Sequence, residues 1–122
     1  MANVITDVIE RSVFFDTILP NNPGLVIMKF GADWCKPCKV SKPLVYEYFN
    51  AMPSNVLCYD VDVDDSFDLY AFFKSKRMIN GIPVILAFKK DNTGYVPDLS
   101  VTGSNNESIT QFFTDSLKLL NN

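Results

Sequence analysis

Two cysteines separated by two residues form the part of this chain best suited to covalent chemistry. They stand in the segment Cys35-Lys36-Pro37-Cys38, a third cysteine, Cys58, lies apart from them, and the chain contains no histidine. The lack of histidine excludes Ser-His-Asp and Cys-His catalysis as well as metal sites built on imidazole. Two cysteines at this spacing can be half of a zinc site, a redox dithiol or a chance pairing.

Zinc is the weaker of the two chemical interpretations. Structural zinc sites use about four ligands, drawn mainly from Cys and His. Only Cys58 remains to join the pair, so a carboxylate would have to complete the set. The alternative without chemistry is two reduced cysteines in a core. A redox role depends on position in the fold, because a reactive thiolate needs positive charge or a helix N-terminus beside it.

A strand, a turn and a helix are predicted around the pair. Residues 25–30 are almost all apolar, as in a strand that is covered on both faces. Residues 35–51 carry apolar side chains at mostly helical spacing. Pro37 suits the first turn of that helix, and Pro43 predicts a kink in it.

This placement puts Cys35 at the N-terminus of the helix. Free backbone N–H groups and the positive end of the helix dipole stabilise a thiolate there. Cys38 lies one turn later on the same face, close enough to bridge back. We therefore predict that Cys35 is the exposed nucleophile and that the more buried Cys38 resolves the mixed disulfide.

The remaining elements alternate between strand and helix. We expect further strands within 3–9, 55–63, 82–88 (beginning at Pro83) and 99–102, and further helices over 12–19, 64–77 and 106–120, with a polar loop over 89–97. The predicted order is βαβαβαββα. It indicates a single α/β domain spanning 1–122, with a central mixed sheet flanked by helices.

Composition narrows the classes of function. The chain has 122 residues, of which 48% are hydrophobic, and a net charge of −3, so we expect one folded domain that binds no nucleic acid. No apolar run approaches the roughly 20 residues of a membrane span. The acidic stretch 60–68 lacks the Gly and Glu of an EF-hand loop, and we predict no metal site. The first residues do not read as a signal peptide, so we expect a cytoplasmic protein.

The segment 30–39 (Phe-Gly-Ala-Asp-Trp-Cys-Lys-Pro-Cys-Lys), Pro43 and Gly81-Ile82-Pro83 resemble the thioredoxin family, and the element order matches over nearly the whole chain. The resemblance implies the thioredoxin fold and reduction of protein disulfides by thiol–disulfide exchange. It implies a redox-active Cys35–Cys38 disulfide and no bound cofactor. It also implies a monomer that is recycled by a thioredoxin reductase, with NADPH as the indirect electron source.

The resemblance also implies a shallow docking surface beside the dithiol. Pro83 matches the family's cis-proline, and the backbone of Ile82 would pair with an incoming substrate strand. Core packing is the alternative for Ile82 and for Trp34. The residues that line the predicted surface are Trp34, Lys36, Pro37, Val63, Ile82, Pro83, Thr102 and Gly103.

Several positions depart from the family. Lys36 replaces the usual Gly and is expected either to lower the pKa of Cys35 or to remain a solvated surface lysine. Lys29 stands where the family has a buried aspartate, and Asp60 stands at the family's lysine position. We hypothesise a charge-reversed pair in which Lys29 serves as the base toward Cys38, or else a Lys29 that snorkels to the surface. Gly31 replaces a second Trp that many members carry.

Two rival functions and one open residue role remain. An oxidase or isomerase on the same fold is one rival, although such relatives often carry His between the cysteines. A non-catalytic binding or accessory subunit is the other. Cys58 is predicted to be a small buried hydrophobe, with a regulatory or dimer-forming thiol as the alternative.

Overall fold

A computed structural model describes residues 4–121. Its elements follow the predicted order. They are β1 (Val4–Ile5), α1 (Arg11–Val13), the π-helical turn η1 (Phe14–Ile18), β2 (Leu25–Gly31), α2 (Lys36–Ala51), β3 (Val56–Asp62), α3 (Phe67–Ser75), β4 (Val84–Lys89), β5 (Leu99–Thr102) and α4 (Asn106–Leu120). The start of the strand expected from residue 3 lies outside the described residues.

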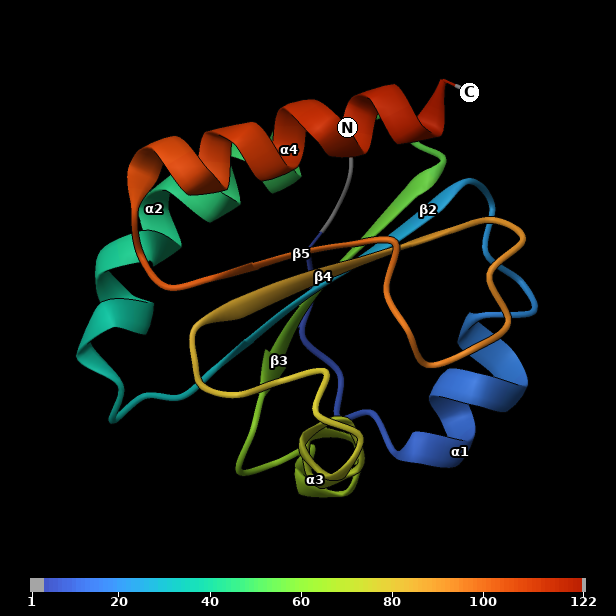
Figure 1. Ribbon diagram of the computed structural model, residues 1–122, viewed down its shortest axis with the longest axis horizontal. Coiled ribbons are helices and arrows are strands. Elements are labelled where there is room, and N and C mark those ends of the chain that lie inside the picture. The colour runs from blue at the N-terminus through green and yellow to red at the C-terminus, as the bar shows by residue number, and fades with distance from the viewer. Residues whose placement is uncertain (1–3, 122) are drawn as a thin grey trace.

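The strands form one mixed five-stranded sheet in the order β1-β3-β2-β4-β5. β1, β3 and β2 run parallel, whereas β4 and β5 are antiparallel to their neighbours. Helices α2 and α4 cover one face and α1 and α3 the other (Figure 1). All seven residues of β2, the central strand, are buried, which confirms the prediction from its apolar sequence.

Helix α2 begins shortly after β2, and the residues of its first turn cap its N-terminus. Cys35 is the N-cap residue, and its sulfur accepts a hydrogen bond from the Cys38 N–H. Pro37 follows within the first turn and Pro43 lies inside the helix. The buried face of the helix begins with Cys38. The apolar spacing therefore turns this cysteine, rather than Lys36 or Lys39, toward the sheet.

Some boundaries differ from the prediction. Among the described residues, the first strand pairs through Val4 and Ile5, and residues 6–9 of the expected strand lie outside the sheet. The helix expected over 12–19 begins at Arg11 and continues as η1. Helix α3 ends at Ser75, and Arg77 adopts a φ of 61°. The strand expected from Pro83 starts at Val84.

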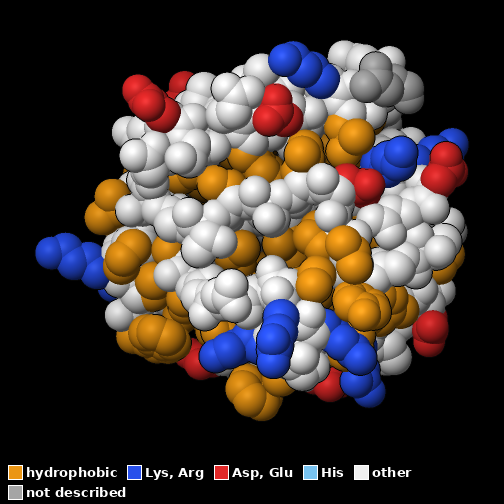
Figure 2. Space-filling model, viewed as in Figure 1, with side chains coloured by type: hydrophobic (Ala, Val, Ile, Leu, Met, Phe, Trp, Pro, Cys, Tyr) orange, Lys and Arg blue, Asp and Glu red, His pale blue; other side chains and the backbone are white. Residues whose placement is uncertain are grey.

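Basic side chains near the end of α3 pack on aromatic rings. Lys74 Nζ lies 5.6 Å from the centre of the Tyr70 ring, and Lys76 Nζ lies 5.8 and 5.4 Å from those of Phe72 and Tyr95. Figure 2 shows basic side chains gathered low on this face, where α3 lies in Figure 1. Cations here also complement the C-terminal end of the helix dipole.

Among the described residues, no helix is both long and apolar enough to cross a membrane.

Candidate active site at the start of α2

The Cys35–Cys38 pair forms a disulfide at the N-terminus of α2. The two Cα atoms are 5.3 Å apart, and the Cys38 N–H lies 3.3 Å from Cys35 Sγ. The sulfur of Cys35 therefore accepts one of the free N–H groups of the first helical turn. This is the position that the sequence predicted for a dithiol.

The two cysteines differ little in exposure. Cys35 is 6% exposed and Cys38 is 3% exposed. Cys38 is the more buried of the two, as predicted, but Cys35 is less open than its proposed role as an exposed nucleophile suggested. The reason is local packing, since Cys35 Sγ lies 3.9 Å from the carbonyl oxygen of Ile82.

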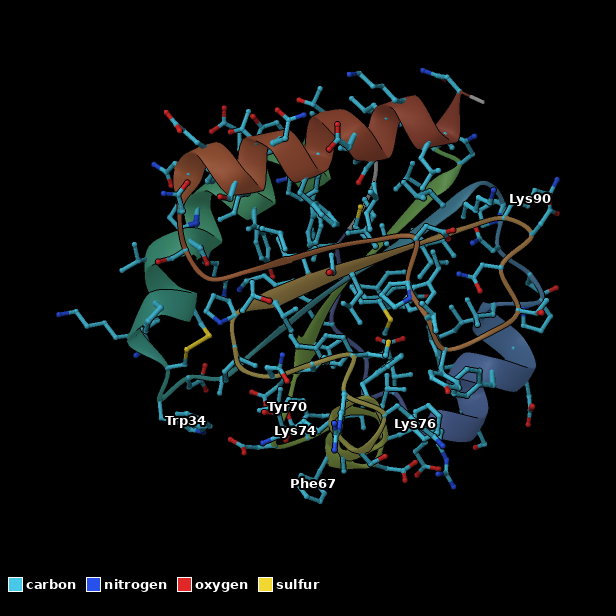
Figure 3. The ribbon with its side chains drawn as sticks, viewed as in Figure 1. Trp34, Phe67, Tyr70, Lys74, Lys76 and Lys90 are labelled. Atoms are coloured by element: carbon cyan, nitrogen blue, oxygen red, sulfur yellow. A yellow bond between two sulfur atoms is a disulfide. The ribbon has the colours of Figure 1, made fainter. Side chains whose placement is uncertain are left out.

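Trp34 projects into solvent beside the disulfide. Its side chain is 69% exposed, and its Nε1–H donates a 2.8 Å hydrogen bond to Asp64 Oδ2. Figure 3 shows it at the edge of the molecule, next to the start of α2. Trp34 is thus an exposed platform rather than a core aromatic. Sequence reasoning missed its partner Asp64, which lies in the acidic stretch 60–68 that was compared only with an EF-hand loop.

The segment before β4 and the residue after β5 form another side of the site around the disulfide. The Ile82–Pro83 peptide bond is cis, as the resemblance implied. The Gly103 N–H donates a 2.8 Å hydrogen bond to the Pro83 carbonyl. Gly103 has a φ of 99°, a conformation that side chains other than glycine adopt only with strain.

The predicted docking residues fall into two groups. Trp34, Lys36, Pro37 and Thr102 are exposed, and Ile82 and Gly103 are partly exposed.

Val63 and Pro83 are buried instead. Val63 is 3% exposed and belongs to the core cluster on the α1 and α3 side of the sheet. Its N–H donates a 2.9 Å hydrogen bond to the Gly31 carbonyl, which draws the residue inward. The prediction that the Val63 side chain lines the docking surface is therefore wrong. Pro83 is also buried, so its side chain does not line the docking surface.

Comparisons with known proteins agree with this geometry. The family model described as Thioredoxin matches residues 6–115. Thioredoxin from Equus caballus is 33% identical over 87 residues, which cover 71% of this chain and 78% of that protein. Thioredoxin from Mus musculus is 31% identical over 106 residues, covering 87% and 92%.

The chain belongs to the thioredoxin family. Its cysteine pair makes it a thiol–disulfide oxidoreductase that acts through the Cys35–Cys38 dithiol. Solved structures add agreement on the fold. The thioredoxin of Trichomonas vaginalis has a TM-score of 0.75 at 20% identity, covering 94% of this chain and 96% of that one. A Plasmodium falciparum thioredoxin has a TM-score of 0.68 at 22% identity, covering 95% and 90%.

Lys29 and Asp60 stand side by side on the two central strands. They are direct partners in the parallel β2–β3 register. Lys29 is only 3% exposed, so the alternative that it snorkels to the surface is wrong. Burial lowers the pKa of Lys29, the nearby Lys42 lowers it further, and Asp60 partly raises it again. The Asp60 carboxylate accepts its hydrogen bond from the Tyr46 hydroxyl.

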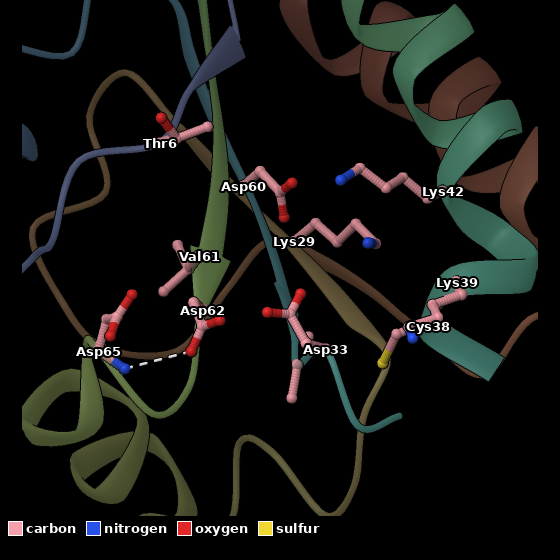
Figure 4. Close-up of a pocket in the computed structure, with 12 residues that line it drawn as sticks. Thr6, Lys29, Asp33, Cys38, Lys39, Lys42, Asp60, Val61, Asp62 and Asp65 are labelled. Carbon is pink, nitrogen blue, oxygen red and sulfur yellow. Dashed lines mark hydrogen bonds between the residues drawn. The ribbon is translucent and has the colours of Figure 1, made fainter. Parts of the chain in front are cut away.

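A polar pocket of about 320 Å³ lies behind the disulfide. Side chains from β2, β3 and α2 converge on it (Figure 4). Its lining residues include Lys29, Gly31, Cys38, Lys42 and Asp60. No local sequence pattern predicts that Lys42 joins this group, because its position depends on how α2 packs over the sheet.

Cys58 is separate from the dithiol. It is fully buried, and its Sγ lies 4.0 Å from the Phe49 carbonyl. Burial raises the pKa of its thiol to about 12. The prediction of a small buried hydrophobe is confirmed. Within residues 4–121, no three His, Cys, Asp or Glu side chains lie close enough together to hold a metal ion.

Proposed function

We propose that this oxidoreductase works in the cell as a protein disulfide reductase that an NADPH-dependent thioredoxin reductase recharges. The observation that carries the proposal is the position of the Cys35 sulfur. It lies at the N-terminus of α2, between the Cys38 N–H and the Ile82 carbonyl. An incoming disulfide can meet this sulfur from the side of the exposed Trp34.

The reaction follows from the two cysteine positions. In the reduced protein, the Cys35 thiolate attacks a sulfur of the target disulfide, and the other target sulfur leaves as a thiolate. Cys38 then attacks Cys35 Sγ. The intramolecular disulfide forms, and the second target sulfur departs. The target has gained two electrons, and the protein ends in the disulfide form described above.

Target recognition is proposed to use the surface around the dithiol. Trp34, Pro37, Ile82 and Thr102 offer partly or fully exposed contacts from several segments. Ile82 lies just before β4, where its backbone can pair with an extended substrate segment.

Lys36 lies on the same rim and is exposed. As a cation next to the helix N-terminus, it favours a thiolate at Cys35 and makes the disulfide more oxidising.

A reducing compartment suits this activity. Thiol-reducing systems maintain free dithiols in the cytoplasm, and we propose that the protein acts there as a monomer, in electron transfer to disulfides and in redox homeostasis. A monomer leaves Trp34 and the dithiol free for protein targets.

The reduction potential of the Cys35–Cys38 pair is the first test. The protein is equilibrated with glutathione or dithiothreitol buffers, and the fluorescence of Trp34, the only tryptophan, reports the redox state. A potential near about −270 mV supports a reductase, whereas one near about −180 mV or above indicates an oxidase or isomerase. The absence of reversible titration would leave only the binding-module alternative.

Turnover is the second test. Reduction of insulin disulfides is followed through NADPH consumption in the presence of a thioredoxin reductase. The Cys35→Ser, Cys38→Ser double variant must be inactive. If this variant keeps its effect in cells, the biological role is binding rather than catalysis.

A further inference from the structure

We propose that Lys29 accepts the proton of the Cys38 thiol when Cys38 resolves the mixed disulfide. The inference deepens the proposed reductase function and rests on it. It assigns a chemical role to a buried lysine on the central strand that the two-cysteine scheme does not use.

Geometry places the amine and the thiol against the same small space. A methyl group built onto Gly31 would lie 3.4 Å from Cys38 Sγ and 3.6 Å from Lys29 Nζ. The two atoms are therefore no more than about 7 Å apart. Because residue 31 is a glycine, no side chain separates them. A short chain of one or two waters can bridge groups at such a distance in a polar pocket of this size.

The surroundings of Lys29 favour it over Asp60 as the partner of Cys38. Lys29 is almost completely buried, and Figure 4 shows its side chain extending from β2 toward α2, on the same side as Cys38. Its strand partner Asp60 takes a hydrogen bond from Tyr46. One oxygen of the Asp60 carboxylate is thereby bound to Tyr46, whereas the atoms nearest to a methyl group on Gly31 belong to Cys38 and Lys29.

The charged groups around the pocket set the protonation of Lys29. Lys39 and Lys42 face it from α2, Asp60 and Asp62 from β3, and Asp33 and Asp65 from the adjoining loops. Burial has the largest effect and, together with Lys42, lowers the pKa of Lys29, while Asp60 opposes them. A lysine with a lowered pKa carries a larger fraction of neutral amine, which is the form able to accept a proton.

The proposed step balances without a further reactant. The Cys38 thiol gives its proton to the neutral Lys29 amine, leaving a thiolate and an ammonium group. The thiolate attacks Cys35 Sγ, the Cys35–target bond breaks, and the target sulfur leaves as a thiolate that takes a proton from solvent. The Lys29 ammonium later returns its proton to solvent through the pocket.

A two-step thiol reaction separates the roles of the cysteines. Reduced protein is mixed with dithiobis-nitrobenzoate in a stopped-flow instrument. Attack by Cys35 releases one coloured thiolate, and resolution by Cys38 releases the second. The Cys38→Ser variant shows only the first phase and so identifies it. The second nitrothiobenzoate group leaves as a stable thiolate and needs no proton. The rate of the second phase therefore reports how readily Cys38 loses its proton.

Lys29→Met is the test variant. Methionine has nearly the length of lysine and fits an apolar strand, so the fold should persist, as circular dichroism will check. We expect the second phase to slow by roughly tenfold to a hundredfold near neutral pH and to regain speed as pH rises, because hydroxide must replace the amine. The first phase should change by less than about twofold. Lys118→Met is the control, which removes an exposed cation of α4 that does not line the pocket and should leave both phases nearly unchanged.

Lys29→Asp distinguishes a proton acceptor from a mere positive charge. If the amine acts as a base, a carboxylate at the same place restores part of the lost rate relative to Lys29→Met. If Lys29 only stabilises the thiolate by its charge, Lys29→Asp is slower still, and the inference is overturned. An unchanged second phase in Lys29→Met, or parallel slowing of both phases, also overturns it. A wild-type protein without a second phase would instead refute the proposed function itself.

Discussion

Replacing Lys29 by methionine should stabilise the protein, and the gain should depend on pH. Lys29 is 3% exposed on the central strand, and burial lowers its pKa from the ordinary value of 10.5. In the range between the lowered pKa and 10.5, the unfolded chain binds the Lys29 proton and the folded protein does not. Stability contributed at this site therefore rises with pH across that range.

Lys29→Met is expected to be the more stable protein because the desolvation cost of Lys29 exceeds its attraction to Asp60. At pH values below the lowered pKa, the folded protein carries a buried ammonium group and bears its full desolvation cost. Asp60 offsets this cost only in part. Replacing a buried charge by a well-packed apolar side chain gains about 1–3 kcal/mol in comparable cases. The wild-type stability should rise by at most about 1.4 kcal/mol per pH unit from this one group.

Urea unfolding of the wild type and of Lys29→Met, measured at several pH values, provides the assay. We expect the midpoint difference to be largest below the lowered pKa of Lys29 and to shrink as the pH rises from there toward 10.5. Lys42→Met serves as the control, because Lys42 is exposed and its loss should change stability by less than about 0.5 kcal/mol.

One result would refute this reasoning. If Lys29→Met is less stable than the wild type by an amount that does not vary with pH, Asp60 fully compensates the charge of Lys29. The lysine would then be a permanently protonated member of an ion pair. It could not accept the Cys38 proton, and the further inference would fall as well.

Four other predictions test the packing. Gly31→Ala should raise the free energy of unfolding by about 0.4–1 kcal/mol, since its methyl group meets no atom closer than 3.4 Å. Gly24→Ala should lower the free energy of unfolding by about 1–3 kcal/mol in the same assay, since its methyl group would lie 2.8 Å from a backbone oxygen. Cys58 should resist iodoacetamide near pH 8 while the protein is folded, because burial raises its thiol pKa to about 12; mass spectrometry showing rapid labelling would contradict its burial. Asp64→Ala should lower the fluorescence anisotropy of Trp34, which loses its hydrogen-bond acceptor, and unchanged anisotropy would show that the bond does not hold the ring.

Local sequence patterns predicted the order of the helices and strands and the position of the dithiol. The predicted ranges 99–102 and 106–120 coincide with β5 and α4. Apolar periodicity and capping residues are properties of neighbouring residues, so they can be recognised without knowing the fold. The junction of a buried strand with a helix that begins at Cys35 is of the same local kind. For this reason the redox chemistry could be inferred before any distance was known.

Contacts between elements required the tertiary structure. The inward position of Val63, the Trp34–Asp64 hydrogen bond and the approach of Lys29 to Cys38 all join residues from different segments. The β2–β3 register decides which side chain faces Asp60, and a shift by one residue would turn Lys29 to the opposite face of the sheet. The sequence by itself determined which residues could react. The packing of α2 over the central strands decided which buried group stands beside the resolving cysteine.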